Sequence, residues 1–262
     1  MKNVFLIGDS IRHGSYVQTL DSNLSPGYGV FVQKLLEGKA NVYSPDENSR
    51  WAQYTLRFLH KWAKDVPDPE KVDVVHWNNG LWDAVRLFGD EPLTPIEFYE
   101  LMLPRVYNRI KLLFPNAKVI FATSTAVIEE MSRPQFTRRN EDIRAYNEVA
   151  KKVMAKLGVE VLDLYAVTEN WGPDMHSDWM HFNDEGCKKL AENNAVKANG
   201  RSYKHLVNLL TTVFTHCSHG KERHEEENKH ILIKKNSTNI RNTITVIIGE
   251  RPALEKQHNC NK

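Results

Sequence analysis

The strongest constraint on the fold of this chain is a repeated alternation between short apolar runs and longer segments with helical spacing. The apolar runs are four to six residues long, which suits the buried strands of a parallel sheet. They cover residues 3–8, 40–43, 72–77, 118–123 and 159–162. The segments between them repeat apolar residues every three or four positions, as amphipathic helices do. This order predicts an α/β fold in which helices cover both faces of a parallel sheet.

Composition divides the chain near Asn199-Gly200. Residues 201–262 carry eleven basic and six acidic residues, whereas all six Trp lie before residue 180. We therefore predict a folded domain over residues 1–199. Residues 200–262 are predicted to be a basic extension of unknown role, partly disordered because its central part is charged and polar.

Several classes of protein are disfavoured by composition. No apolar run approaches the ~20 residues of a membrane span, and the start of the chain lacks the apolar core of a signal peptide. A net charge of +2 gives no electrostatic reason to bind nucleic acid or membranes. The three Cys form neither a disulfide framework nor a zinc spacing. These observations predict a cytoplasmic protein.

Reactive side chains follow the predicted strands at their carboxyl ends. Gly8-Asp9-Ser10 follows the first strand, and residues 78–83 follow the third. Residues 174–183, beyond the fifth strand, contain two acids and two histidines. Ligands of parallel α/β sheets bind at this edge, so these segments are expected to meet. A hydroxyl, amides and an acid–histidine pair are what an acyl-transfer site needs.

The chemistry assigns a role to each of these groups. A serine hydroxyl is a weak nucleophile until a base accepts its proton, and a histidine has a suitable pKa. Ser10 is the predicted nucleophile, His181 the base and Asp178 the acid that orients His181. The predicted oxyanion donors are the Ser10 backbone N–H, the Asn78 amide and a backbone N–H near Asn48. This chemistry needs no metal or cofactor.

Three of these segments together resemble the SGNH/GDSL hydrolase family. They are Gly8-Asp9-Ser10-Ile11, Trp77-Asn78-Asn79-Gly80-Leu81-Trp82-Asp83, and Asp178-x-x-His181, and the resemblance covers roughly residues 2–197. It implies a three-layer α/β/α sandwich with a flavodoxin-like five-stranded sheet, and a metal-free serine esterase or lipase mechanism. It also implies the same roles for Ser10, Asp178, His181 and Asn78.

The sequence departs from the family pattern in two blocks. The third block usually reads Gly-x-Asn-Asp, whereas here Trp82 stands where Asn belongs. Asn78 is our substitute for that Asn, and Asn79 is its rival. The Gly of the second block is also absent, and Asn48 takes the expected position.

Two other interpretations of residues 174–183 stay open. His176, with Asp174 as its acid, competes with His181 for the role of base. Alternatively, Asp174, His176, Asp178 and His181 could bind a metal, although their irregular loop lacks the i, i+4 spacing common in helical metal sites.

The substrate is less constrained by the sequence. Five Trp lie in or beside the segments that follow the predicted strands at their carboxyl ends: Trp51, Trp77, Trp82, Trp171 and Trp179. They are either core residues or a wall for a sugar ring or acyl group. We predict substrate contacts for Asp9, Trp77 and Trp179. The polar loop 129–139, which holds Arg138, is expected to be solvated or to cap the site.

The predicted function is hydrolysis of small acyl esters, O-acetyl groups of carbohydrates above all, so the expected partner is a small acylated sugar. The alternatives are a lysophospholipase or thioesterase acting on lipids, and a non-catalytic carbohydrate-binding module on the same fold. The oligomeric state does not follow from the sequence.

Overall fold

A five-stranded parallel sheet organises the structure, a computed structural model that describes residues 1–13, 26–192, 196–198 and 201–203. The strand order is β2-β1-β3-β5-β7, which is the flavodoxin-like order. Its members are β1 (Lys2–Ile7), β2 (Ala40–Tyr43), β3 (Val74–Asn78), β5 (Lys118–Ala122) and β7 (Glu160–Leu162). Each corresponds to one predicted apolar run, with ends shifted by at most two residues. The predicted fold class is confirmed.

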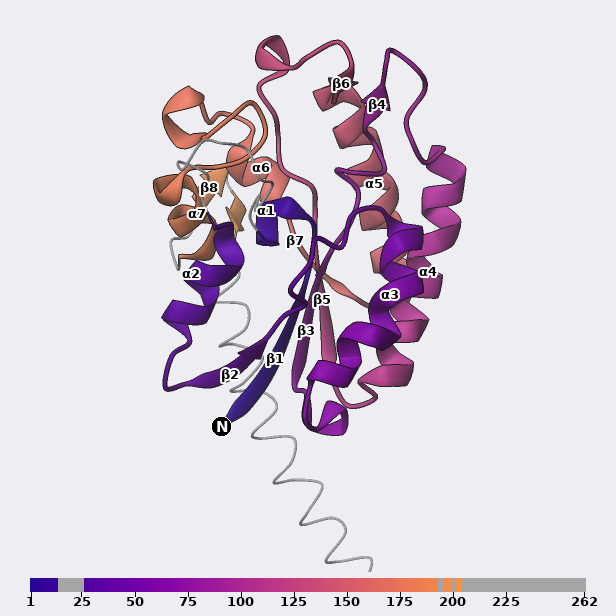
Figure 1. Ribbon diagram of the computed structural model, residues 1–262, viewed down its shortest axis with the longest axis vertical. Helices are drawn as coiled ribbons and strands as arrows, with labels where there is room; N and C mark the ends of the chain where they lie inside the picture. Colours follow the sequence, from indigo (N-terminus) through magenta and orange to yellow (C-terminus); the bar gives the residue numbers. More distant parts are fainter. Residues whose placement is uncertain (14–25, 193–195, 199–200, 204–262) are drawn as a thin grey trace, which may run out of the picture. The chain divides into compact units, whose positions relative to one another are not determined.

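Helices cover both faces of the sheet (Figure 1). One face carries α2 (Tyr28–Leu35) and α7 (Asp184–Ala191), which pack against each other. The opposite face carries α3 (Ala52–Trp62), α4 (Ile96–Leu113) and α5 (Asn140–Leu157). Shorter helices are α1 (Ser10–His13), α6 (Leu164–Thr168), η1 (Ala63–Asp65), η2 (Pro69–Lys71), η3 (Glu129–Met131) and η4 (Pro173–Met175). The result is the expected α/β/α arrangement of three layers.

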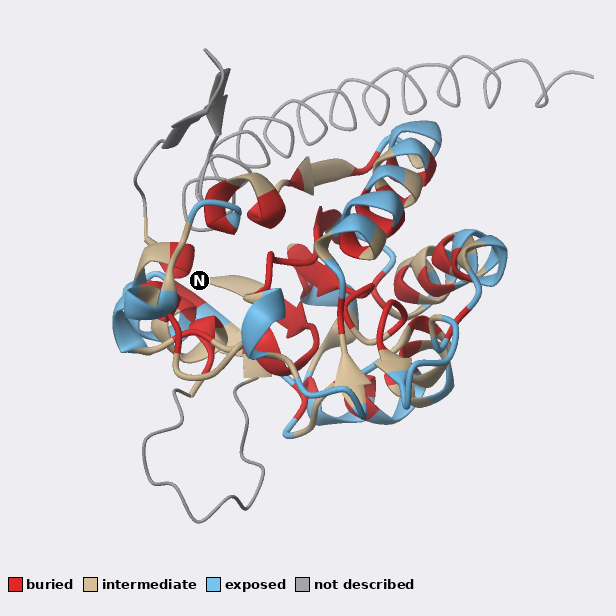
Figure 2. Ribbon diagram, turned by 90° about the horizontal axis from the view of Figure 1, so that it is seen from above, coloured by how far each residue is buried: buried red, intermediate tan, exposed pale blue. Residues whose placement is uncertain are grey.

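The core lies between the sheet and the helix faces that turn toward it. All residues of β3 are buried, as are the last four of β1. In Figure 2, buried residues concentrate on the strands and on the inner sides of the helices. Burying one large apolar side chain stabilises a fold by about 1.5–3 kcal/mol. The helices packed on the two faces of the sheet therefore hold the strands in place. The carboxyl ends of β1 and β3 are therefore held side by side.

A small antiparallel arm lies at the carboxyl edge of the sheet. It pairs β4 (Arg86–Leu87) with β6 (Phe136–Thr137). The Arg86 guanidinium donates two hydrogen bonds to the Asp142 carboxylate, of 2.7 and 3.0 Å, and so fastens the arm to α5. A bidentate pair of this kind has a defined geometry. The arm thereby fixes the residues that follow β6.

The predicted domain boundary falls inside a second antiparallel pair. Strands β8 (Val196–Ala198) and β9 (Arg201–Tyr203) lie on either side of Asn199-Gly200. The predicted extension beyond β9, residues 204–262, lies outside the described residues. The division into a domain and an extension stays a prediction.

Candidate active site

Ser10 lies at the point where the first strand turns into a short helix. It is the first residue of α1, three residues after Ile7, the last residue of β1. The turn needs glycine at position 8, because a Cβ there would lie 2.8 Å from the Cβ of Arg12. Asp9 fixes the turn by accepting the Ile11 N–H through Oδ1 at 3.0 Å. The Ser10 hydroxyl is thus placed at the carboxyl edge of the sheet.

His181 and Asp178 belong to a tight loop before α7. His176 and Phe182 form an isolated antiparallel bridge, and the Ser177 N–H donates to the His181 carbonyl. Asp178 Oδ1 accepts the backbone N–H groups of Met180 and His181, at 2.7 and 2.6 Å. These bonds fix the carboxylate, which leaves its other oxygen directed at the His181 ring.

A chain of hydrogen bonds joins the three predicted catalytic residues. Asp178 Oδ2 lies 2.6 Å from His181 Nδ1, and His181 Nε2 lies 2.8 Å from Ser10 Oγ. An ionised carboxylate only accepts, so Nδ1 carries the ring proton and Nε2 is left to accept the Ser10 hydroxyl proton. The structure therefore brings together, over 171 positions of sequence, the residues predicted to be the nucleophile, the base and the orienting acid.

The hydrogen bonds around Asp178 favour its ionised form. Burial alone would raise the pKa of the Asp178 carboxyl, but the His181 ring and the N–H groups of His181 and Met180 outweigh burial and lower the pKa. A carboxylate that stays ionised can hold the imidazole in one tautomer and stabilise the imidazolium that forms during proton transfer.

The turn after β3 lies next to the Ser10 turn and is fixed by two of its own residues. Gly80 has a φ of +135°, and a Cβ there would lie 2.7 Å from Ser124 Oγ, so glycine is required. The Asp83 carboxylate accepts the Ala52 N–H at 3.1 Å, which ties this turn to the start of α3. Burial raises the pKa of Asp83 to about 7.

The Asn78 and Asn79 amides, the two candidates for the oxyanion, both donate to backbone carbonyls. Asn78 Nδ2 donates to the carbonyls of Ala122 and Thr123, at 3.1 and 3.4 Å. An amide nitrogen carries two N–H donors, so the role of Asn78 at the oxyanion stays a prediction. The rival Asn79 donates to the Arg50 carbonyl at 2.8 Å. Both side chains thus connect neighbouring segments of the active edge.

The segment around Asn48 is held close to the Ser10 turn. The Ser49 N–H donates to the Gly8 carbonyl, and the Gly8 N–H donates to Ser49 Oγ. Asn48 Oδ1 accepts the Arg50 N–H, which supports the left-handed conformation of Arg50, with φ of 51°. The role of the Asn48 backbone N–H at the oxyanion stays a prediction.

Two predicted substrate contacts are wrong. Asp9 and Trp77 are fully buried, so neither presents surface to a ligand. The Asp9 side chain shapes the Ser10 turn instead. The Trp77 indole packs edge-on against Phe121 and donates to Asn79 Oδ1 at 2.6 Å. Strand β3 is central and buried on both faces, which is why its aromatic side chain belongs to the core.

We expect Trp77→Ala to lower the free energy of unfolding by about 3–5 kcal/mol, because it empties a large volume in the core. Denaturant unfolding of the purified variant measures this. Trp179→Ala is the matched control, since Trp179 is partly exposed and lies beside the active residues. Equal destabilisation by the two substitutions would contradict the assignment of Trp77 to the core.

The two other interpretations of residues 174–183, His176 as the base and a metal site, find no support in the geometry. His176 Nδ1 lies 2.8 Å from the Gly172 carbonyl, and its ring packs on Phe182. Burial lowers the pKa of His176. His181, and not His176, is therefore the histidine in contact with Ser10. Among the described residues, no group of three or more His, Cys, Asp or Glu could hold a metal ion.

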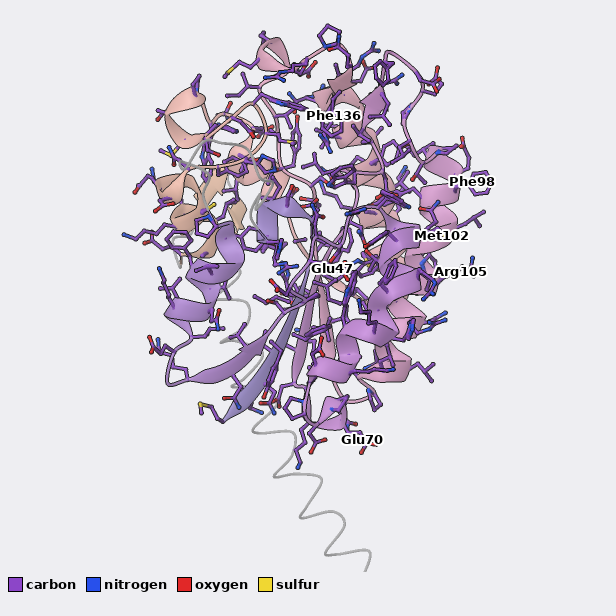
Figure 3. All side chains as sticks on the ribbon, in the orientation of Figure 1. Glu47, Glu70, Phe98, Met102, Arg105 and Phe136 are labelled. Carbon is purple, nitrogen blue, oxygen red and sulfur yellow. The ribbon has the colours of Figure 1, made fainter. Side chains whose placement is uncertain are left out.

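Arg138 is the residue whose observed environment differs most from the sequence prediction. Its loop is polar, so solvation was the natural expectation, yet the side chain is only 1% exposed. The guanidinium lies 4.8–5.6 Å from the ring centroids of Trp82, Phe136 and Trp179. Phe136, labelled in Figure 3, belongs to β6 of the arm. Phe136 is a close neighbour of Arg138 in the sequence, but only the tertiary fold adds Trp82 and Trp179.

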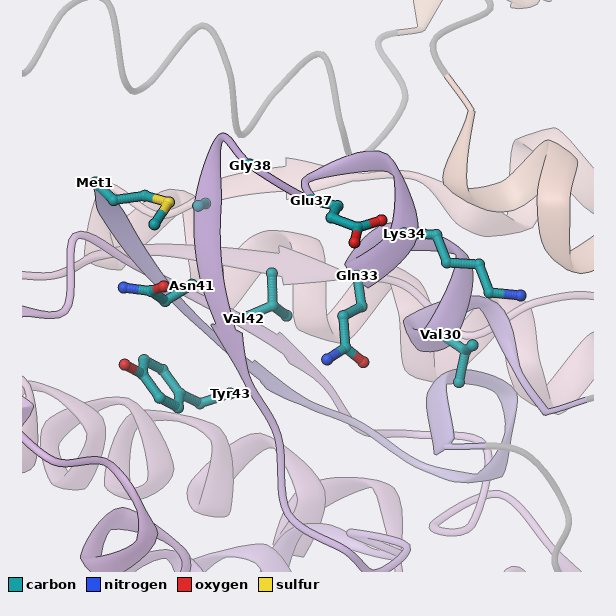
Figure 4. Close-up of a pocket in the computed structure, with 10 residues that line it drawn as sticks. Met1, Val30, Gln33, Lys34, Glu37, Gly38, Asn41, Val42 and Tyr43 are labelled. Atoms are coloured by element: carbon teal, nitrogen blue, oxygen red, sulfur yellow. The ribbon is translucent and has the colours of Figure 1, made fainter.

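A separate cavity of about 550 Å³ lies at the sheet edge formed by β2, against α2 (Figure 4). Val30, Gln33 and Lys34 line it from α2, and residues 40–43 line it from β2. None of its lining residues belongs to the Ser10–His181–Asp178 chain.

In the described part of the sequence, no helix has the length and apolarity needed to cross a membrane.

The sequence is similar to those of known proteins. Residues 6–189 match the model of the GDSL-like Lipase/Acylhydrolase family. The chain is 23% identical over 177 residues to the GDSL esterase/lipase WDL1 of Oryza sativa subsp. japonica, a match that covers 63% of this chain and 68% of the relative.

Solved structures share the fold. A lipase/acylhydrolase from Enterococcus faecalis superposes with a TM-score of 0.56 at 23% identity, covering 73% of this chain and 92% of that one. The acetyl xylan esterase AlAXEase gives 0.51 at 20% identity, covering 72% and 96%. Because the family match spans well over half of its length, the chain belongs to the GDSL-like lipase/acylhydrolase family and is a hydrolase of ester bonds.

Proposed function

We propose that the chain is a serine esterase that removes small acyl groups, O-acetyl groups of carbohydrates above all, by a Ser-His-Asp mechanism. The observation that carries the proposal is the continuous hydrogen-bond chain from Asp178 through His181 to Ser10. Its distances lie within the range needed for proton transfer between a nucleophile and a general base.

The reaction follows from the donors and acceptors in that chain. Ser10 Oγ attacks the ester carbonyl carbon while its proton passes to His181 Nε2. The tetrahedral intermediate collapses when the C–O bond to the alcohol breaks, and His181 returns the proton to the leaving oxygen. Water, deprotonated by the same nitrogen, then attacks the acyl-Ser10 ester and releases the acid. The Ser10 N–H and the N–H near Asn48 are the proposed backbone donors to the oxyanion.

The preference for an acylated sugar is supported by the side chains at the active edge. Trp51, Trp82, Phe136 and Trp179 are partly exposed and form a connected series of ring contacts with centroid distances of 5.7–6.3 Å. Aromatic side chains combine large apolar faces with polar edges, which suits the faces of sugar rings. A solved structure of similar fold is that of an acetyl xylan esterase.

We expect the purified chain to hydrolyse p-nitrophenyl acetate with a kcat/KM at least about tenfold above that for the octanoate or decanoate ester, because one misfitted methylene already changes discrimination by ~1–3 kcal/mol. Release of acetate from acetylated xylo-oligosaccharides is the second assay. A preference for long acyl chains would identify a lipid hydrolase or thioesterase instead. Sugar binding without turnover of any ester would identify a non-catalytic module.

A further inference from the structure

The loop that holds the predicted acid and base is shaped by its own hydrogen bonds, but these bonds do not set its position relative to Ser10. Asp178 Oδ1 accepts the backbone N–H groups of Met180 and His181, and both bonds lie within the loop. The distance of 2.8 Å between His181 Nε2 and Ser10 Oγ therefore depends on contacts between the loop and other elements. A misplacement of about 1 Å can lower a rate about 10²-fold, so these contacts matter for catalysis.

Arg138 contacts both residues that lie between the acid and the base. Its guanidinium carbon lies 5.6 Å from the ring centroid of Trp179, and its Nη1 lies 3.1 Å from Met180 Sδ. Trp179 and Met180 are the two residues that separate Asp178 from His181 in the chain. Arg138 therefore holds the loop at its centre.

The same guanidinium contacts the turn after β3. Arg138 Nε donates to the Leu81 carbonyl at 2.5 Å. At the start of this turn, Asn78 Oδ1 accepts the N–H of Asp9, the residue before Ser10, at 3.4 Å. Arg138 thus links the loop of the predicted base to the turn that borders the predicted nucleophile.

The surroundings of Arg138 keep its side chain in place and charged. The side chain is buried, and its guanidinium carbon lies 4.8 Å from the ring centroid of Phe136 in β6. Burial lowers the pKa of Arg138 to about 10, against the opposite effect of Asp9 and Asp178, so the group is a cation at neutral pH. Moving a buried cation away from its rings and carboxyl groups is costly, because an unpaired buried charge is strongly destabilising. The cation is therefore a fixed point for the loop.

We propose that Arg138 is a positioning residue that holds the loop of Asp178 and His181 at the distance from Ser10 at which proton transfer occurs. The proposal rests on the proposed esterase function and names a residue that acts through the acid and the base. The alternative is a purely structural role in the core. Loss of such a role would lower stability and leave the hydrogen bond between Asp178 and His181 unchanged.

Arg138→Gln removes the charge and keeps an amide that can donate to the Leu81 carbonyl. The kcat for p-nitrophenyl acetate should fall about 10–100-fold, with KM within about threefold of wild type, because the loop moves relative to Ser10 while substrate contacts remain. Arg138→Lys keeps the charge and should lose less, about three- to tenfold, since an ammonium cannot replace the planar guanidinium fork. Thermal unfolding identifies the variants that fold.

The hydrogen bond between Asp178 and His181 gives a second readout that does not depend on turnover. The proton on His181 Nδ1 lies in a short, charge-assisted hydrogen bond, so its proton NMR signal is expected downfield of the backbone amides. Loss of the signal in His181→Ala identifies it. In folded Arg138→Gln the signal should weaken or disappear, because the loop no longer holds the acid and the base in register.

Arg144→Gln is the matched control. Arg144 lies on α5, donates to the Tyr165 hydroxyl at 2.9 Å and lies over the same ring at 6.0 Å from its centroid. It is also an arginine over an aromatic ring, but that ring belongs to α6 and not to the loop of His181. Turnover should stay within about threefold of wild type, with the NMR signal unchanged.

Three results would overturn the proposal. The first is a folded Arg138→Gln variant with wild-type kcat. The second is a loss confined to KM, which would assign Arg138 to substrate binding. The third is a loss of kcat with the NMR signal of His181 unchanged. If Arg138→Gln does not fold, Arg138→Lys decides, and wild-type kcat with an unchanged signal in that variant contradicts the proposal.

Failure of the esterase function gives a different result. Wild type would then hydrolyse no ester faster than Ser10→Ala, while the NMR signal of His181 would still respond to Arg138→Gln.

Discussion

Ser10→Ala is expected to lower kcat by about 10⁵–10⁶-fold, to the level left by binding and the backbone donors alone. The reason is that no other hydroxyl in the described part of the chain is hydrogen-bonded to an imidazole supported by a carboxylate, as Ser10 Oγ is at 2.8 Å. The alanine side chain fills no new volume, so the thermal unfolding temperature should change little. Steady-state hydrolysis of p-nitrophenyl acetate gives the measurement.

Ser44→Ala is the matched control for this substitution. Ser44 is exposed and lies just after β2. It should keep wild-type turnover. Comparable activity of Ser10→Ala and wild type would show that Ser10 is not the nucleophile.

Asp178→Asn is expected to lower kcat by about 10⁴-fold while leaving the loop intact. An asparagine Oδ1 can still accept the backbone N–H groups of Met180 and His181. Its amide, however, can present an N–H toward His181 Nδ1, which favours the tautomer with the proton on Nε2. That tautomer cannot accept the Ser10 proton. His181→Ala should cost at least as much, because it removes the base.

His176→Ala separates this account from the rival assignment of the base. Its ring contacts the Gly172 carbonyl and Phe182, and it serves neither Ser10 nor Asp178. We expect some loss of stability and retention of most of the turnover. Near-complete loss of turnover in a folded His176→Ala variant, with Asp178→Asn unaffected, would favour His176 as the base.

The fold was predictable because its determinants are local or periodic. The five strands are short apolar runs typical of a parallel sheet, and Gly158 ends α5 in the left-handed conformation that glycine adopts readily. The meeting of Ser10, Asp178 and His181 could be predicted because each lies where a strand or loop reaches one edge of the sheet. The order of strands and loops along the chain places these three residues at the same edge of the sheet. The sequence therefore also predicts that their segments meet.

The remaining parts of the site depend on side-chain directions that no pattern specifies. Asn78 lies at the predicted edge, but its amide turns toward the carbonyls at the end of β5. Trp77 belongs to an active-edge segment, yet it lies on a strand with no exposed face. Arg138 looks like a loop residue, yet its guanidinium lies over Trp82 and Trp179 from distant segments as well as over the neighbouring Phe136. Tertiary packing decides each of these cases.

The most direct test of the account is the site of covalent labelling by a fluorophosphonate, read by mass spectrometry of the digested protein. The account predicts a single adduct on the peptide that contains Ser10, formed at a rate that drops sharply in His181→Ala and in Asp178→Asn. An adduct on another residue, or equal labelling of Ser10 in wild type and His181→Ala, would contradict it.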